Sequence, residues 1–116
     1  MIKTPTDAMP AVDEIRAIGG DELVREMMTT FVRYATVHVQ RLSEAAEHGD
    51  LEAGATIAHT LKSSARQLGA MHLGEVCASA ELAARGGDAA GFVKWTEEVT
   101  GAYADAKGWM EDLATP

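Results

Sequence analysis

The feature that most constrains the fold of this chain is the absence of proline between Ala11 and Thr115, because all three prolines, Pro5, Pro10 and Pro116, lie outside that stretch. Proline interrupts helices because it lacks a backbone N–H and its ring clashes with the preceding turn. Alanine, leucine, glutamate and methionine are abundant in the stretch, and all four are strong helix formers. No segment alternates apolar with polar residues as a half-buried strand would. The sequence therefore predicts an all-α protein.

Apolar residues recur at steps of three and four in several long stretches, which indicates amphipathic helices. Glycines separate these stretches, and Asp50 and Asp88 are placed as N-caps of the helices that follow them. The helices expected on this basis are a short one at Ala11–Ile18, then Asp21 to about Ala46, Leu51 to about Leu68, about His72 to Arg85, and about Ala89 to Leu113.

Two- to four-residue turns make consecutive helices antiparallel. We therefore expect an antiparallel up-down four-helix bundle with a short extra N-terminal helix. Residues 1–10 are expected to form a flexible leader, and residues 11–116 a single bundle domain, which suits a chain of 116 residues.

Charge and cysteine content exclude several classes of function. The net charge is −8, and neither a nucleic-acid backbone nor an anionic membrane is expected to bind such an acidic protein. Cys77 is the single cysteine, so no internal disulfide and no thiolate metal site is expected. The sequence shows neither a secretory signal nor a long apolar span. We expect a cytoplasmic protein with Cys77 as a small core residue.

His59 stands out because it lies beside the apolar stripe of its predicted helix rather than on it. Small residues one turn away on either side, Ala55 and Ser63, are expected to leave the imidazole uncrowded. A cation, Lys62, follows three residues later. This arrangement suits an imidazole that a bulky partner must reach and that must then carry negative charge. Spacing alone leaves open the alternative of an ordinary surface histidine on a helical adaptor that binds signalling partners without chemistry.

The segment Ala58–Gly69, with the sequence AHTLKSSARQLG, resembles the signature of histidine-containing phosphotransfer (HPt) domains, H-x-L-K-G followed six residues later by glycine. The resemblance extends over about residues 11–113. It includes the following further segments and residues: Val12–Ile15, Gly19–Leu23, Phe31, Gly49–Asp50, Leu73, Cys77, Glu81 and Gly86–Asp88.

The resemblance implies a multistep phosphorelay. His59 would accept a phosphoryl group from the receiver domain of a hybrid histidine kinase and pass it to the receiver domain of a response regulator. Lys62 would stabilise the phosphoryl charge. The protein would be a stoichiometric carrier rather than an enzyme, and a monomer. It would hold no metal or cofactor of its own, since Mg²⁺ would lie on the receiver. A kinase using ATP directly is disfavoured, because the sequence has no G-x-x-x-x-G-K-[ST] loop.

Glu81 and Arg85 lie four residues apart on the next predicted helix, which in similar proteins packs beside the histidine. Glu81 is expected to accept a hydrogen bond from the imidazole Nδ1–H, and Arg85 to screen the phosphoryl group. The plainer alternative is an i, i+4 ion pair worth a few tenths of a kcal/mol.

Ser63 departs from the family pattern, which has glycine at this position. A serine adds only a hydroxymethyl group, so we expect a receiver still to approach, with altered affinity or partner choice. The predicted docking face consists of Ala55, Thr56 and Arg66 together with Lys62 and Ser63.

Overall fold

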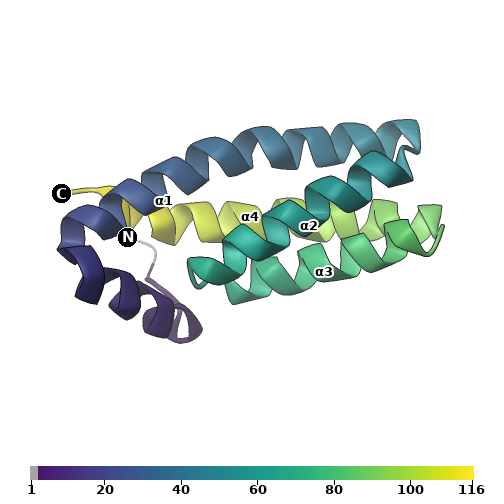
Figure 1. The fold of residues 1–116 in the computed structure, drawn as a ribbon. Helices are drawn as coiled ribbons and strands as arrows, with labels where there is room; N and C mark the ends of the chain where they lie inside the picture. The colour runs from purple at the N-terminus through teal and green to yellow at the C-terminus, as the bar shows by residue number, and fades with distance from the viewer. Residues whose placement is uncertain (1–2) are drawn as a thin grey trace.

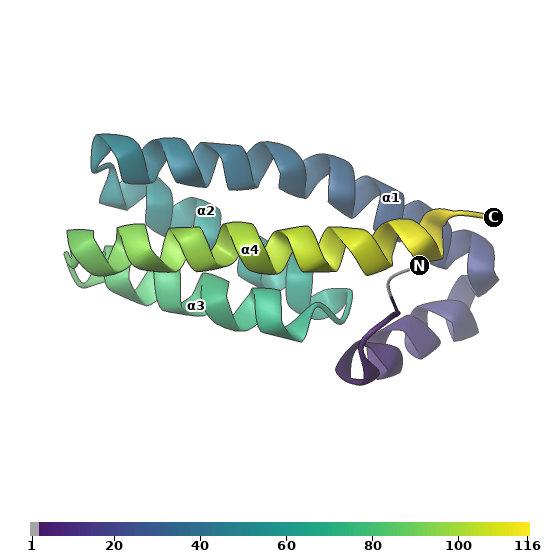
Figure 2. The ribbon, with the colours of Figure 1, turned by 180° about the vertical axis from the view of Figure 1, so that it is seen from behind.

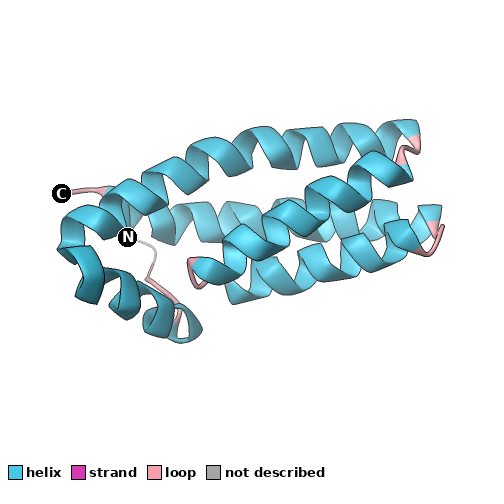
Figure 3. Cartoon of the chain, viewed as in Figure 1, coloured by secondary structure: helices cyan, strands magenta, loops and turns pink. Residues whose placement is uncertain are grey.

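The computed structural model describes residues 3–116, and Met1 and Ile2 of the expected leader lie outside the described residues. A short 3-10 helix, η1 (Thr6–Ala8), precedes four helices: α1 (Met9–His48), α2 (Leu51–Gln67), α3 (Met71–Arg85) and α4 (Ala89–Ala114). No strand occurs in the described part of the chain (Figure 3). Figures 1 and 2 show the four helices as an elongated antiparallel bundle, which confirms the predicted all-α class.

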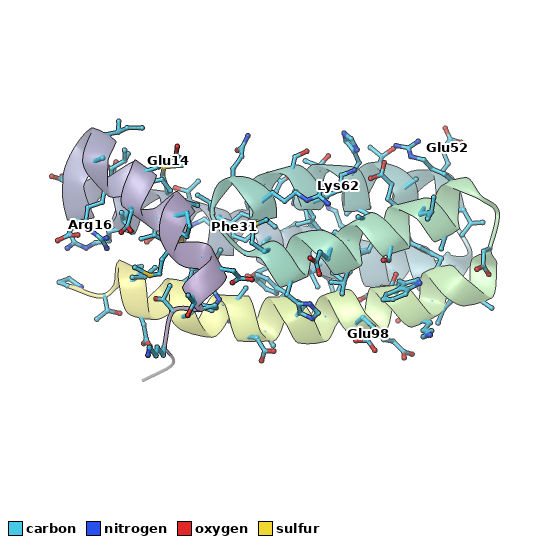
Figure 4. All side chains as sticks on the ribbon, turned by 90° about the horizontal axis from the view of Figure 1, so that it is seen from below. Glu14, Arg16, Phe31, Glu52, Lys62 and Glu98 are labelled. Atoms are coloured by element: carbon cyan, nitrogen blue, oxygen red, sulfur yellow. The ribbon has the colours of Figure 1, made fainter. Side chains whose placement is uncertain are left out.

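The break expected at the glycine pair is a sharp bend inside α1. Gly20 has φ 73° and ψ −169°, a combination that glycine tolerates because it has no side chain to clash. The segment before Gly20 therefore turns away from the rest of α1 and forms the predicted extra N-terminal helix (Figure 1). Arg16, labelled on this segment in Figure 4, pairs with Asp13 at 3.0 Å and with Asp21 beyond the bend at 2.7 Å.

The N-terminal boundary of the helical part differs from the prediction. Of the expected leader, Thr6–Ala8 forms a helical turn and Met9 begins α1. Ala8 is fully buried, and a Cβ added at Gly69 would lie 2.7 Å from the Ala8 carbonyl oxygen. Pro10 is compatible with this helix start, since the first helical residues need no N–H donor. The described part of the leader thus packs against the turn that follows α2.

The turns confirm the predicted caps. The Asp50 carboxylate accepts a hydrogen bond from the Ala53 amide at 3.1 Å, and the Asp88 carboxylate accepts one from Gly91 at 2.9 Å. Gly49 ends α1 in the left-handed conformation, with φ 67°. These short turns make α1, α2, α3 and α4 consecutively antiparallel.

The core contains large side chains from all four helices, but α2 and α3 bury mainly small ones. The residues concerned are Ala58, Ala65, Cys77, Ala80 and Ala84. Small residues let two helix backbones approach closely, and a Cβ at Gly74 of α3 would lie 2.8 Å from Cγ of Arg66 on α2. The two helices run side by side in Figures 1 and 2. A side chain of α3 can therefore reach the polar face of α2.

Candidate functional site

His59 projects from a rigid part of the bundle. Its neighbours Ala58 and Leu61 are both fully buried, so this turn of α2 is anchored in the core. The imidazole itself is 55% exposed. The backbone of His59 is therefore held in place while its ring remains accessible to another protein.

Glu81 of α3 is the centre of the polar cluster around this histidine. One carboxylate oxygen, Oε2, accepts hydrogen bonds from His59 Nδ1 at 3.1 Å and from Arg85 Nε at 2.8 Å. The other, Oε1, accepts from Lys62 Nζ at 2.7 Å. The structure thus brings together His59, Lys62, Glu81 and Arg85, four of the residues singled out in the sequence. Lys62 projects from the C-terminal half of α2 (Figure 4).

The Glu81 carboxylate is ionised although its side chain is only 11% exposed. Burial opposes the charge, but hydrogen bonds from Lys62, Arg85 and His59 outweigh it and lower the pKa of Glu81 to about 2. An ionised carboxylate can only accept hydrogen bonds, so the proton of a neutral His59 is assigned to Nδ1. This tautomer leaves the lone pair on Nε2, the outer nitrogen of the ring.

The cluster carries more positive than negative charge. Lys62 and Arg85 supply two cations for the single carboxylate of Glu81. The Lys62 side chain is 21% exposed and pairs directly with Glu81, whereas the Arg85 side chain is 58% exposed. A local excess of positive charge near the ring favours an anionic group bound there.

The five residues predicted to form the docking face differ in exposure, and the Lys62 side chain is 21% exposed. Thr56, Ser63 and Arg66 are exposed on α2. Ala55 is a core residue with 5% exposure, so the prediction that it lines a docking face is wrong. Its position on the helix turns it inward, next to the buried Gly54, and it can contribute almost no contact area.

A groove between α1 and α2 was not predicted. It has a volume of about 810 Å³. Its α1 side combines apolar and aromatic residues (Leu23, Met27, Phe31 and Tyr34) with polar and charged ones (Arg25, Glu26, Thr29, Thr30 and Arg33). The other side consists of Ser64 and Gln67 at the end of α2 and Leu68 just after it. The α2 part begins just over one turn after His59. The signal that could have located it is a second line of apolar residues on α1, beside the stripe that fills the core.

Other kinds of site find no support in the part of the chain that the structure describes. It contains no group of three or more histidine, cysteine or acidic residues that could hold a metal ion. Cys77 is fully buried, and burial raises the pKa of its thiol to about 12. Within residues 3–116, no helix has both the length and the apolar character required to cross a membrane.

Comparison with known proteins identifies one family. Residues 26–109 match the Hpt domain, and this range includes all four members of the polar cluster. No significant match to a curated protein or to a solved structure was found. The family match covers most of the chain and contains the exposed imidazole whose inner nitrogen is hydrogen-bonded. The chain belongs to the Hpt domain family, whose members carry out histidine phosphotransfer in phosphorelay signalling.

Proposed function

We propose that this protein accepts a phosphoryl group on Nε2 of His59 from the aspartyl phosphate of one receiver domain and passes it to the aspartate of another. The donor would be the receiver of a hybrid histidine kinase, and the final acceptor a response regulator. The observation that carries the proposal is an exposed imidazole whose Nδ1 is hydrogen-bonded to an ionised glutamate. This hydrogen bond leaves the exposed ring with its lone pair on Nε2.

The chemistry requires positioning and positive charge more than a strong base. In phosphoryl transfer the transition state is loose, and negative charge spreads over the phosphoryl oxygens. His59 lies in the middle of α2, where the helix dipole offers no anion-binding site. Lys62 and Arg85 therefore supply the positive charge from this chain. The protein acts as a stoichiometric carrier without a cofactor of its own, and Mg²⁺ belongs to the receiver.

The receiver would dock over His59 and extend across α2 to the groove on its α1 side. Thr56, Ser63 and Arg66 provide the exposed surface of α2. The apolar lining of the groove adds surface that can be buried on association, which is the main favourable contribution to protein–protein binding. Ser63 lies one turn from His59, so its small side chain leaves space for a partner. We expect a cytoplasmic monomer.

A transfer assay tests the proposal. The wild-type protein, His59→Gln and the control His72→Gln are incubated with a phosphorylated receiver domain. Base-stable, acid-labile label is expected on the wild type and on the control, because His72 is an exposed histidine outside the cluster. Label that persists on His59→Gln would exclude His59 as the acceptor.

The same assay separates the carrier from a helical adaptor. An adaptor would use the groove to bind a partner but would take up no label from any receiver. Lys62→Ala should transfer more slowly than the wild type while keeping its helical circular dichroism spectrum. An unchanged transfer rate would contradict the electrostatic role of Lys62.

A further inference from the structure

We infer that the Glu81 carboxylate holds the Nδ1 proton on the ring of His59 while phosphorus is bound to Nε2. Transfer of the phosphoryl group then always leaves a neutral imidazole behind. The inference rests on the proposed function, since it concerns the phosphorylated form of His59. Glu81 would therefore act in the onward transfer step, in addition to fixing the proton of the free histidine on Nδ1.

The balance of atoms and charge shows why this proton matters. In the forward step the Nε2 lone pair forms the P–N bond, the P–O bond breaks, and the aspartate leaves as a carboxylate with the bonding electrons. No proton is released, so the ring keeps Nδ1–H and gains one positive charge. In the onward step the P–N bond breaks and its electrons return to Nε2, which restores the neutral imidazole.

Loss of the Nδ1 proton from the phosphorylated ring would block the onward step. The ring would then be neutral while phosphorylated, and breaking the P–N bond would expel an imidazolate anion. Imidazolate is a strong base and therefore a poor leaving group. A neighbouring negative charge that accepts a hydrogen bond from Nδ1–H prevents this loss, because it favours the positively charged ring.

The geometry of the cluster suits this function. Glu81 Oε2 faces His59 Nδ1 at 3.1 Å, on the side of the ring opposite the outer nitrogen. A buried carboxylate near a phosphoryl group would ordinarily repel it, but Lys62 and Arg85 both pair with this carboxylate. The cluster can therefore stabilise a cationic ring through Glu81 and still present net positive charge to the phosphoryl oxygens.

A purely structural reading is that Glu81 only ties α3 to α2. The substitution Glu81→Gln distinguishes the two readings, because glutamine has nearly the same shape and its carbonyl can still accept the hydrogen bond from Nδ1–H. It removes the negative charge and replaces the oxygen that accepts from Lys62 with an NH2 group, a change at Lys62 that does not depend on pH. Glu75→Gln serves as the matched control, because it makes the same change at an exposed position of the same helix.

The experiment uses protein phosphorylated with phosphoramidate, a small donor that needs no partner protein. Loss of the phosphoryl group to water is followed by ³¹P NMR from about pH 6 to about pH 9, a range that begins near the ordinary pKa of imidazole and extends well above it. In parallel, ¹⁵N NMR of the labelled ring reports whether Nδ1 of the phosphohistidine carries a proton. Circular dichroism verifies that each variant is folded.

The wild type and Glu75→Gln should lose the phosphoryl group at a nearly constant rate and keep the Nδ1 proton over the whole range. Glu81→Gln should lose the proton within it, and its rate should then fall roughly tenfold for each further pH unit. A change in how Lys62 or Arg85 contacts the phosphoryl group would shift the rate equally at all pH values.

Two different outcomes would refute two different claims. Superimposable pH profiles for wild type and Glu81→Gln, with both phosphorylated on His59, would overturn the inference and leave the carrier function intact. Absence of any phosphohistidine signal that depends on His59 would refute the proposed function itself. If Glu81→Gln does not fold, the ¹⁵N measurement on the wild type still tests the inference, because a phosphorylated ring that loses its Nδ1 proton below about pH 9 contradicts it.

Discussion

Replacing Glu81 with glutamine should change how the stability of this domain depends on pH. In the folded protein the pKa of Glu81 lies at about 2, below its ordinary value of 4.5. A carboxyl group whose pKa is lowered by folding stabilises the folded state at pH values above its unfolded pKa. The contribution should therefore be complete above about pH 4.5 and disappear as the pH falls towards 2.

The size of the effect follows from the same two values. Lowering the pKa of Glu81 from 4.5 to about 2 corresponds to about 3 kcal/mol. The Glu81 side chain is only 11% exposed, but the side chains of His59 and Arg85 are 55% and 58% exposed, so solvent screens part of these interactions and the value is an upper limit. Small domains are stable by about 5–15 kcal/mol in total, so this single carboxylate would account for a substantial share.

Urea unfolding followed by far-UV circular dichroism at several pH values measures this contribution. The free energy of unfolding of Glu81→Gln should lie below that of the wild type at pH 7, by at most about 3 kcal/mol. The difference should shrink towards zero between about pH 4.5 and pH 2. Subtracting the two free energies of unfolding removes the contribution of the other carboxylates, which wild type and Glu81→Gln share. The control Glu75→Gln should not differ from the wild type in this way. If wild type and Glu81→Gln lose stability in parallel on acidification, the three hydrogen bonds do not stabilise the ionised form as argued.

Further substitutions at four positions test the packing and the docking face. Tyr103→Phe should lower the free energy of unfolding by about 1 kcal/mol, because the hydroxyl donates to a backbone carbonyl of α1 at 2.9 Å; an unchanged urea midpoint would contradict this. Gly54→Ala should destabilise the protein by about 1–3 kcal/mol, because the new Cβ would overlap the Phe92 ring. A Cβ added at Gly101 meets no atom within 4 Å, so Gly101→Ala should stabilise the protein by up to about 1 kcal/mol. Equal effects of the two substitutions in thermal melts would refute the distinction. Ser63→Gly should transfer phosphoryl at least as fast as the wild type and Ser63→Gln more slowly, and equal rates in the transfer assay would show that this position does not face the receiver.

The fold could be predicted because its determinants are local in the sequence. Asp50 and Asp88 cap the helices they precede, and Gly49 takes the left-handed conformation that ends α1. Such signals depend on residues within one turn of each other. The packing of the leader could not be predicted from such local signals, because the burial of Ala8 depends on a contact with Gly69, which is distant in sequence.

The site could be predicted only in part. The spacing of Glu81 and Arg85 placed them on one face of a helix, and resemblance to a family placed that face beside His59. The burial of Ala55 could have been predicted, because it lies four residues after Leu51 and three before Ala58 on the apolar side of the helix. A step of one residue rotates the position by about 100°, which turns Thr56 to the exposed side. The groove escaped prediction because it depends on how α1 and α2 diverge, which is set by packing across the whole bundle.

The bend at Gly20 means that the smallest fragment able to fold is longer than the segment recognisable as a family member. The family match begins at residue 26, but Val12 and Ile15 before the bend are buried. Together with Ala8, this segment shields the end of the bundle where α2 passes into α3. A fragment trimmed to residues 26–109 would leave apolar surface at that end open to water, and it should aggregate or melt early even though it keeps every residue of the phosphotransfer cluster.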